Sequence, residues 1–509
     1  MLSFNFKLSA TMPTNRAQRA PISAKTLSRS AGVLRLLSTV ALLLFAPVAA
    51  SASDAPPLNS RLDAIIKREV PENVSVSVQV IDLETGRVLM EKDPDLALTP
   101  ASTMKVLTTA AALRSLSPDF TFVTEVLADN VRGDSVGNIF LKGGGDPYMV
   151  SEELFALTRS VRDKGLTEIR GNIVVDDSYF IPGQPLDENE KLGLRAYHAP
   201  YSALSLNFND IKIVVHPGPR AGEPARFVAD PVSEYAVVKG NVKTVKGDKP
   251  AQVTITKETT DDGREIISLD GVIGETSPTW NRYVNVASPA LYTGEVFKEF
   301  LLREGIRVAG RVVNGQTPPS AALYHEHKSR PLGLIVYGLN KFSNNVMAEE
   351  ICLALGAKIY GAPGTREKGI AVIRKHLLDC GVPESNFTLS EASGLSRSNR
   401  LSASALVKVL LAATRDFTYN AEFMASFGVA GVDGTLKEKF ADAGAKRRLR
   451  AKTGTLRGVN ALAGYGISPD RRVFVFAVIA NGAQKNATSF IDHADKIARA
   501  ILDIPLGKR

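Results

Sequence analysis

The sequence contains 509 residues, and its 44% hydrophobic and 23% charged content is typical of a globular protein with two or three domains. The formal net charge of +9 is concentrated at the N-terminus, because residues 1–53 contain six Lys or Arg and no Asp or Glu. The rest of the chain has 56 basic and 53 acidic residues, a net charge of +3 that argues against a nucleic-acid partner.

The N-terminal segment has the order of an export signal. Basic residues precede an apolar run over 40–46, and the small residues Ala50-Ser51-Ala52 follow as a fitting cleavage site. A retained membrane anchor is the alternative, but the run is short for the ~20 residues that cross a bilayer. We predict a cleaved signal peptide over 1–52 and a periplasmic protein, and we leave peripheral membrane contact and the oligomeric state open.

Residues 53–119 alternate between helical and strand patterns. Helical spacing over 62–68 precedes an alternating strand over 74–80, and a turn leads to a second strand over 88–90. Good helix formers follow Pro100. This segment is expected to form the first part of an α/β domain.

The segment 120–285 has a different pattern, in which short alternating stretches lie between turn-rich stretches. The expected strands cover 122–127, 138–141, 171–175, 211–215, 253–255 and 265–269. We predict an inserted β-rich module over 120–285, made of one or two subdomains.

Helical periodicity returns over 286–509. The expected helices cover 290–305, 331–355, 368–380 and 402–415, and two apolar strands cover 459–467 and 472–480. A final helix is expected to present Phe490, Ala494, Ile497 and Ile501 on one face. The simplest architecture is one α/β (α+β) domain built from both ends of the chain and interrupted by the insertion.

The two cysteines, Cys352 and Cys380, are too few for a disulfide framework, and each lies in an apolar helical pattern. Two buried thiols and one disulfide are both open. His325 and His327 would share one face of a strand, but no third ligand lies nearby in the sequence. We therefore predict no metal site and no cofactor.

Ser102 and Lys105 form the single Ser-x-x-Lys in the chain, where the helix after Pro100 begins. Residues i and i+3 share a helix face, so the Lys105 amine can lie beside the Ser102 hydroxyl. A neutral lysine could then activate the serine as a nucleophile. The alternative is an N-cap serine with an exposed lysine, and this pair alone favours that simpler interpretation.

A second motif, Ser343-Asn344-Asn345, lies at the predicted start of another helix. A hydroxyl and an amide two residues apart can relay a proton and orient a substrate amide. Taken alone, Ser343 and Asn345 are equally typical of a helix cap.

A third motif, Lys452-Thr453-Gly454-Thr455, opens a predicted apolar strand whose edge can pair with an extended peptide. We expect the charge of Lys452 to lower the pKa of Lys105, and we expect Thr453 to bind a substrate carboxylate. Gly454 allows a close backbone approach because it has no Cβ. Taken alone, the motif is an ordinary strand start.

The three motifs together are the signature of serine β-lactamases and penicillin-binding proteins, with Ser-Asn-Asn in place of Ser-Asp-Asn. In detail the chain resembles the low-molecular-mass class C penicillin-binding proteins, which are D-alanyl-D-alanine carboxypeptidases and endopeptidases. The similar segments cover 143–147, 199–209 and 391–402, and the 241 residues from Ser102 to Ser343 leave room for an insertion. The resemblance extends over essentially the whole chain after the signal, and it implies a penicillin-recognising α/β domain with an inserted module.

By this resemblance, Ser102 attacks the carbonyl between two D-alanines of a peptidoglycan stem peptide, and Lys105 is its general base. Ser343 and Asn345 would support proton transfer, while Lys452 and Thr453 would hold the terminal carboxylate. The backbone N–H groups of Ser102 and Thr455 would form the oxyanion hole. β-Lactams would acylate the same serine. A β-lactamase and a non-catalytic wall-binding scaffold are the alternatives.

Two further residues match positions that bind diaminopimelate in similar proteins. Asp146 and Arg397 would bind its amine and its carboxylate, since a zwitterionic group requires one charge of each sign. The alternatives are a turn aspartate and a surface arginine. Where the family often has Asp-Gly-Ser-Gly-Leu-Ser, this chain has Glu391-Ala392-Ser393-Gly394-Leu395-Ser396, which leaves the local loop geometry open.

Overall fold

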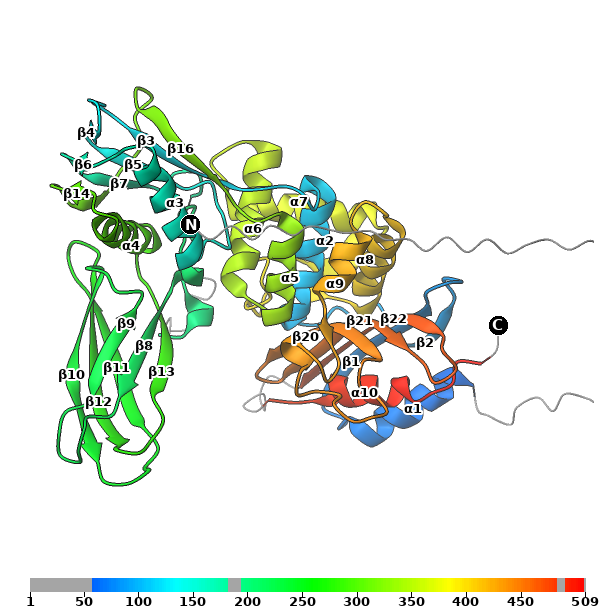
Figure 1. Ribbon diagram of the computed structural model, residues 1–509. Coiled ribbons are helices and arrows are strands. Elements are labelled where there is room, and N and C mark those ends of the chain that lie inside the picture. The colour runs from blue at the N-terminus through cyan, green and yellow to red at the C-terminus, as the bar shows by residue number, and fades with distance from the viewer. Residues whose placement is uncertain (1–56, 182–193, 483–489, 508–509) are drawn as a thin grey trace, which may run out of the picture. The chain divides into compact units, whose positions relative to one another are not determined.

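The computed structural model describes residues 57–181, 194–482 and 490–507 (Figure 1). The predicted signal peptide, 1–52, lies outside the described residues. Within the described ranges, no helix is long and apolar enough to cross a membrane.

An antiparallel six-stranded sheet is formed by both ends of the chain, in the order β19-β20-β21-β22-β1-β2. Its strands are β19 (Gly428–Val429), β20 (Leu449–Leu456), β21 (Val459–Ile467), β22 (Val473–Gly482), β1 (Val74–Asp82) and β2 (Val88–Lys92). β1 pairs with β22 along its whole length, from Val74 opposite Gly482 to Asp82 opposite Phe474. The N-terminal strands therefore complete a sheet that the C-terminal strands begin.

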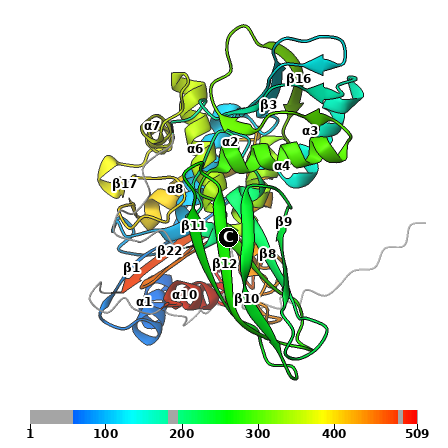
Figure 2. The same ribbon diagram turned by 90° about the vertical axis from the view of Figure 1, so that its left-hand side faces the viewer.

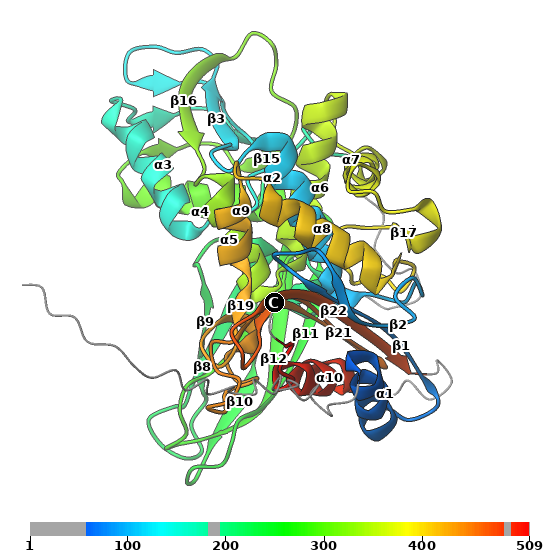
Figure 3. The same ribbon diagram turned by 90° about the vertical axis from the view of Figure 1, so that its right-hand side faces the viewer.

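Helices cover both faces of this sheet (Figures 1 and 3). One face packs on α1 (Leu58–Glu69) and α10 (His493–Leu502). The other face packs in one core with α2 (Met104–Leu116), α5 (Leu332–Phe342), α6 (Asn345–Tyr360), α7 (Arg366–Asp379), α8 (Ala403–Arg415) and α9 (Asn420–Ser426). The alternation of side chains along β22 explains this arrangement. Phe474, Phe476 and Val478 pack in the core with α1 and α10, while the intervening residues pack in the core with α2. The short strands β17 (Phe387–Thr388) and β18 (Arg400–Leu401) pair with each other.

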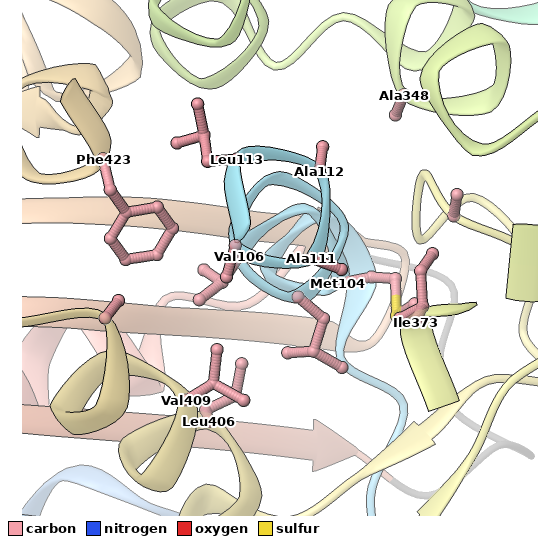
Figure 4. Close-up of a cluster of buried hydrophobic side chains, with 14 of the residues drawn as sticks. Met104, Val106, Ala111, Ala112, Leu113, Ala348, Ile373, Leu406, Val409 and Phe423 are labelled. Atoms are coloured by element: carbon pink, nitrogen blue, oxygen red, sulfur yellow. The ribbon is translucent and has the colours of Figure 1, made fainter. Parts of the chain in front are cut away.

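Helix α2 lies at the centre of the larger core, and its residues are buried from Met104 to Leu113 (Figure 4). Around it lie Ala348 of α6, Ile373 of α7, Leu406 and Val409 of α8, and Phe423 of α9. A helix that is buried on every side must be held by its neighbours rather than by its own amphipathicity. The helix that begins directly after Ser102 is therefore fixed by the core.

The chain between α2 and α5 builds a second hydrophobic core with its own sheets. A five-stranded sheet contains β15 (Val312–Asn314), β7 (Ile173–Asp176), β5 (Ile139–Lys142), β3 (Val123–Ala128) and β16 (Ala322–Lys328). A smaller sheet contains β14 (Arg307–Val308), β6 (Glu168–Ile169) and β4 (Ser135–Val136). Helices α3 (Ser151–Asp163) and α4 (Pro289–Arg303) pack into the same core.

Two further three-stranded sheets continue this segment (Figure 2). They contain β13 (Trp280–Asn285), β8 (Asp210–His216) and β9 (Arg226–Asp230), and β10 (Ala236–Val245), β12 (Glu265–Gly274) and β11 (Gln252–Thr259). Five short 3-10 turns are described, η1 (Ala101–Thr103), η2 (Ala196–His198), η3 (Asn207–Asn209), η4 (Glu384–Asn386) and η5 (Gly434–Leu436).

The α/β class predicted from the sequence is confirmed, with helices and strands mixed in one chain. The expected boundary at 285 falls inside the second core, which includes α4, and β16 pairs with β3. These contacts favour an insertion that ends near residue 328. The helical spacing predicts α4 but does not indicate which sheet this helix covers. From the sequence alone, α4 therefore belongs with the helices that follow it.

Two smaller expectations have definite outcomes. Phe490 does not share the apolar face of α10, because the helix begins at His493 and the Phe490 side chain is 70% exposed. The sequence left a disulfide and two separate thiols open. Cys352 and Cys380 are free thiols in the structure.

The core between the sheet and α10 provides a stability prediction. Leu462 of β21 is fully buried there, whereas Val473 of β22 is 41% exposed. Leu462→Ala should lower the free energy of unfolding by about 2–5 kcal/mol, because it removes apolar contacts and leaves a cavity. Urea unfolding followed by circular dichroism measures the change. Val473→Ala is the control, and an equal loss in both variants would contradict this account of the core.

Candidate active site

Ser102 lies in η1, between the sheet and the N-terminus of α2, and it is the only residue of this turn that is not buried. The preceding residue, Ala101, has a φ of +47°, a conformation that non-glycine residues rarely adopt. Gly394 makes room for this turn, because a Cβ at its position would lie 1.9 Å from the Ala101 carbonyl oxygen. Ser102 is thus held at the surface by a strained and tightly packed backbone.

Lys105 lies one helical turn further on and is 0% exposed. Its Nζ donates to Ser102 Oγ at 3.1 Å, to Asn345 Oδ1 at 2.7 Å and to the carbonyl oxygen of Ser393. Burial lowers the pKa of Lys105 to about 8, while electrostatic interaction with Glu391, and after it Glu349, acts in the opposite direction. About a tenth of this lysine is therefore neutral at pH 7 and able to accept a proton, a far larger share than for an amine in water.

Lys452 of β20 is also fully buried and donates to Ser343 Oγ at 2.8 Å. Burial, followed by repulsion from Lys105, lowers the pKa of Lys452 well below its ordinary value. The sequence suggested that Lys452 would lower the pKa of Lys105, but the structure attributes the shift at Lys105 to burial. Ser343 itself ends α5 in the left-handed region, with a φ of 58°, and so turns its hydroxyl toward Lys452.

Helix α6 begins directly after this turn. Asn344 caps it by accepting a hydrogen bond from Met347 N at 3.0 Å. Asn345 contacts two separate parts of the chain, since its Oδ1 accepts from Lys105 and its Nδ2 donates to Tyr197 O at 3.2 Å. The sequence left a helix cap and a catalytic role open for this motif. The structure assigns the cap to Asn344, and the catalytic role of Asn345 stays a prediction.

The third motif packs β20 against the turn that contains Ser102. A Cβ on Gly454 would lie 2.6 Å from Pro100 O and 3.2 Å from Thr103 N, so the strand can approach η1 this closely only with glycine. Thr453 donates to Thr435 Oγ1 at 2.8 Å, and Thr455 is exposed.

Among the residues that the structure describes, β20 lacks a strand partner on one edge beside the site. Within the described residues, β19 pairs with β20 only at Arg450 and Ala451, so its ladder ends before Lys452. The backbone that follows on this edge can accept an extended peptide as an added strand.

The two residues predicted to bind diaminopimelate have different positions. Arg397 is exposed, and its guanidinium donates to Arg457 O at 2.8 Å, just beyond the end of β20. Asp146 is 4% exposed and accepts from Tyr148 N at 2.9 Å. Burial raises the pKa of Asp146 to about 7. No hydrogen bond among the described residues joins it to Ser102 or Lys105, and its predicted contact with diaminopimelate stays a prediction.

Three buried acids around the site are not predicted by the sequence patterns. Glu349 and Glu350 follow Asn345 by one turn of α6, and Glu391 begins the loop that contacts Lys105. A signal was present, because two adjacent glutamates inside an apolar helix are rarely buried without partners. Their partners lie far away in the sequence, so the pattern could not reveal which loops they bind.

The arrangement contains the parts of a nucleophilic serine site. A surface hydroxyl lies beside a buried amine of lowered pKa, and a second hydroxyl and lysine lie opposite, next to an open strand edge. Within the described ranges, no group of three or more His, Cys, Asp or Glu side chains could hold a metal ion.

Comparisons with known proteins agree with this geometry. The model of the family described as D-Ala-D-Ala carboxypeptidase 3 (S13) matches residues 58–500. The chain is 31% identical to a D-alanyl-D-alanine carboxypeptidase of Actinomadura sp. (strain R39), over 88% of this chain and 85% of the relative. It is 24% identical to the D-alanyl-D-alanine carboxypeptidase DacB of Haemophilus influenzae, over 82% of this chain and 87% of the relative. The crystal structure of penicillin binding protein 4 from Haemophilus influenzae shares the fold, with a TM-score of 0.73, 21% identity and coverage of 87% and 99%.

The lowered pKa of Lys105 generates a prediction for acylation of Ser102. Protonated Lys105 cannot accept the serine proton, so the second-order rate of labelling by a fluorescent penicillin should rise with pH and reach half its maximum near the pKa of about 8. Stopped-flow fluorescence measures this rate, with Ser102→Ala as the unlabelled background. A rate that stays constant from about pH 6 to 9 would exclude Lys105 as the base.

Proposed function

The chain belongs to the D-Ala-D-Ala carboxypeptidase 3 (S13) family, and from this premise we propose that it is a serine-type D-alanyl-D-alanine carboxypeptidase acting on peptidoglycan stem peptides. One observation carries the proposal. The Nζ of the fully buried Lys105 lies 3.1 Å from Ser102 Oγ. A lysine in this position can serve as a base without help from a histidine.

Acylation would begin when neutral Lys105 removes the Ser102 proton and Oγ attacks the carbonyl between the two terminal D-alanines. The N–H groups of Ser102 and Thr455 would donate to the oxygen that becomes negative. As the C–N bond breaks, the proton would pass to the departing amine through Ser343, which already accepts from Lys452. D-Alanine would leave, and water would then hydrolyse the acyl-enzyme and regenerate the serine.

The substrate would be held by the open edge of β20. An extended peptide can form main-chain hydrogen bonds there, and Lys452 and Thr453 place a cation and a hydroxyl for the terminal carboxylate. β-Lactams carry a strained amide and a carboxylate with a similar spacing, so they would acylate the same serine.

The site of action follows from the substrate. Peptidoglycan lies outside the cytoplasmic membrane, so we propose that the protein is exported to the periplasm by the signal predicted over 1–52. Cleavage of peptide cross-links, the endopeptidase reaction, would use the same acyl-enzyme, and both reactions belong to this proposal.

Incubation with purified peptidoglycan fragments tests the proposed reaction. Mass spectrometry should show loss of one D-alanine from pentapeptides, and cross-linked dimers report endopeptidase cleavage in the same sample. Penicillin should add its mass to the wild-type protein and abolish the reaction, whereas Ser102→Ala should show neither the adduct nor the product. Product formation by Ser102→Ala equal to that of the wild type would refute the mechanism.

Substrate preference can be tested at Arg397, which lies exposed at the end of β20. We propose that it binds the side-chain carboxylate of diaminopimelate, a group that lysine lacks. Arg397→Ala should lower kcat/KM about 10-fold for diaminopimelate-containing peptides and much less for lysine-containing ones, because a charged hydrogen bond is lost.

The control for this measurement is Arg303→Ala, since Arg303 is an exposed arginine of α4 in the inserted segment. Equal losses on both peptide classes in Arg397→Ala would remove the arginine from this role. The proposal does not extend to Asp146, whose buried position gives less support for a contact with substrate.

A further inference from the structure

Two buried carboxyl groups lie behind the catalytic lysine. Glu349 of α6 is 3% exposed and Glu391 is 1% exposed, and both act electrostatically on Lys105. Neither has a part in the reaction steps described above. Buried acids are costly to desolvate, so their retention at this position requires specific partners.

Glu391 accepts hydrogen bonds from its own loop. Its carboxylate accepts from Ser393 N at 2.8 Å and from Gly394 N at 2.7 Å, and also from the Ser393 hydroxyl and the Asn399 side-chain amide. Four donors converge on this one group, which is the environment of an ionised carboxylate.

Glu349 binds the same loop from the opposite side. Its Oε1 accepts from Ala392 N at 3.0 Å and from Ser393 N at 2.8 Å. Burial raises the pKa of Glu349 well above its ordinary value, and the charge of Glu391 and a hydrogen bond to it act in the same direction. Two adjacent buried carboxylates repel each other, which favours a single proton held between them.

The loop held in this way contacts both catalytic groups. The Ser393 carbonyl oxygen accepts from Lys105 Nζ, and Thr108 Oγ1 of α2 donates to Ala392 O at 2.7 Å. Gly394 packs directly on the backbone of Ala101 and Ser102. A shift of this loop would therefore displace the nucleophile and its base together.

We propose that Glu349 and Glu391 form a carboxylic acid–carboxylate pair with one shared proton and one net negative charge. The pair positions the Ser393 carbonyl against Lys105, and its single charge sets the pH at which Lys105 becomes a base. Glu349 and Glu391 are positioning residues, and this inference rests on the proposed function of Ser102 and Lys105.

Other ionisable groups surround the pair and the lysine from each packed element. Lys452 of β20 approaches Lys105, and Arg366 of α7 lies 3.9 Å from Glu349 Oε2. Tyr201 and Cys352 also lie nearby, and burial raises the pKa of both, so they are neutral near pH 7. Glu391 is the first-listed charge that acts on the pKa of Lys105, and it opposes the effect of burial.

The two glutamates should respond differently to the same substitution. Glu349→Gln replaces the proposed acid with an amide that can still donate to Glu391 and accept from the loop, so the pH midpoint of labelling by fluorescent penicillin should stay unchanged. Glu391→Gln removes the charge that stabilises protonated Lys105. Its pH midpoint should therefore fall by about one unit or more.

Glu350→Gln is the matched control, because Glu350 is an adjacent buried glutamate of α6 that binds Ser202 and Ser205 instead of the 391–394 loop. It should leave the pH midpoint unchanged. Glu391→Asp retains the charge and should also keep the midpoint, so it replaces Glu391→Gln if that variant fails to fold.

The infrared difference spectrum between wild type and Glu349→Gln at pH 7 gives an independent readout. It should contain the C=O stretch of a protonated carboxyl group. Absence of this band, or an unchanged midpoint in Glu391→Gln, would overturn the proposed pair. Failure of wild-type Ser102 to be labelled would instead refute the proposed function, so the two failures are distinguishable.

Discussion

The site depends on the burial of one lysine amine. Lys105 has no contact with solvent, and its three hydrogen-bond partners come from η1, α6 and the loop after Glu391. An amine in water holds its proton far above neutral pH, and burial lowers the pKa of Lys105 to about 8. Lys105 is buried because α2 is buried on every side. The lowered pKa beside Ser102 therefore depends on the packing of the large core.

Helix α6 contacts Lys105 and also the loops that surround the site. Asn345 binds Lys105 and the backbone of Tyr197, and one turn later Glu349 binds the 391–394 loop. Glu350 binds the loop of residues 202–209 through Ser202 and Ser205. Burial raises the pKa of Glu350 to about 8, so it binds that loop largely as a neutral group. A single helix start therefore orients three segments that are remote in the sequence.

The sequence predicted the three motifs of the site, but it did not predict the buried glutamates that surround them. Ser102, Lys105 and the two later motifs each have a fixed spacing and a helix-start or strand-start context, and such local patterns can be read without a structure. Glu349, Glu350 and Glu391 have no such spacing. Glu350 binds a loop more than a hundred residues away, and Glu349 meets the loop of Glu391 only through the fold. The fold class followed from periodicity, whereas the end of the insertion depends on which strand β16 joins, a long-range choice that local pattern does not determine.

The inserted segment also contributes to the site rather than only lengthening the chain. Tyr197, Ser202 and Ser205 all belong to it, and each is hydrogen-bonded to Asn345 or Glu350 of α6. Without these residues, Asn345 Nδ2 would lose a hydrogen-bond partner and the carboxyl of Glu350 would be buried without its donors. A buried polar group without a partner costs free energy of folding. Asn345 thus links Lys105 to the part of the chain between α2 and α5. A chain without that part would retain the three motifs but would lose the Tyr197 partner of the asparagine that binds Lys105.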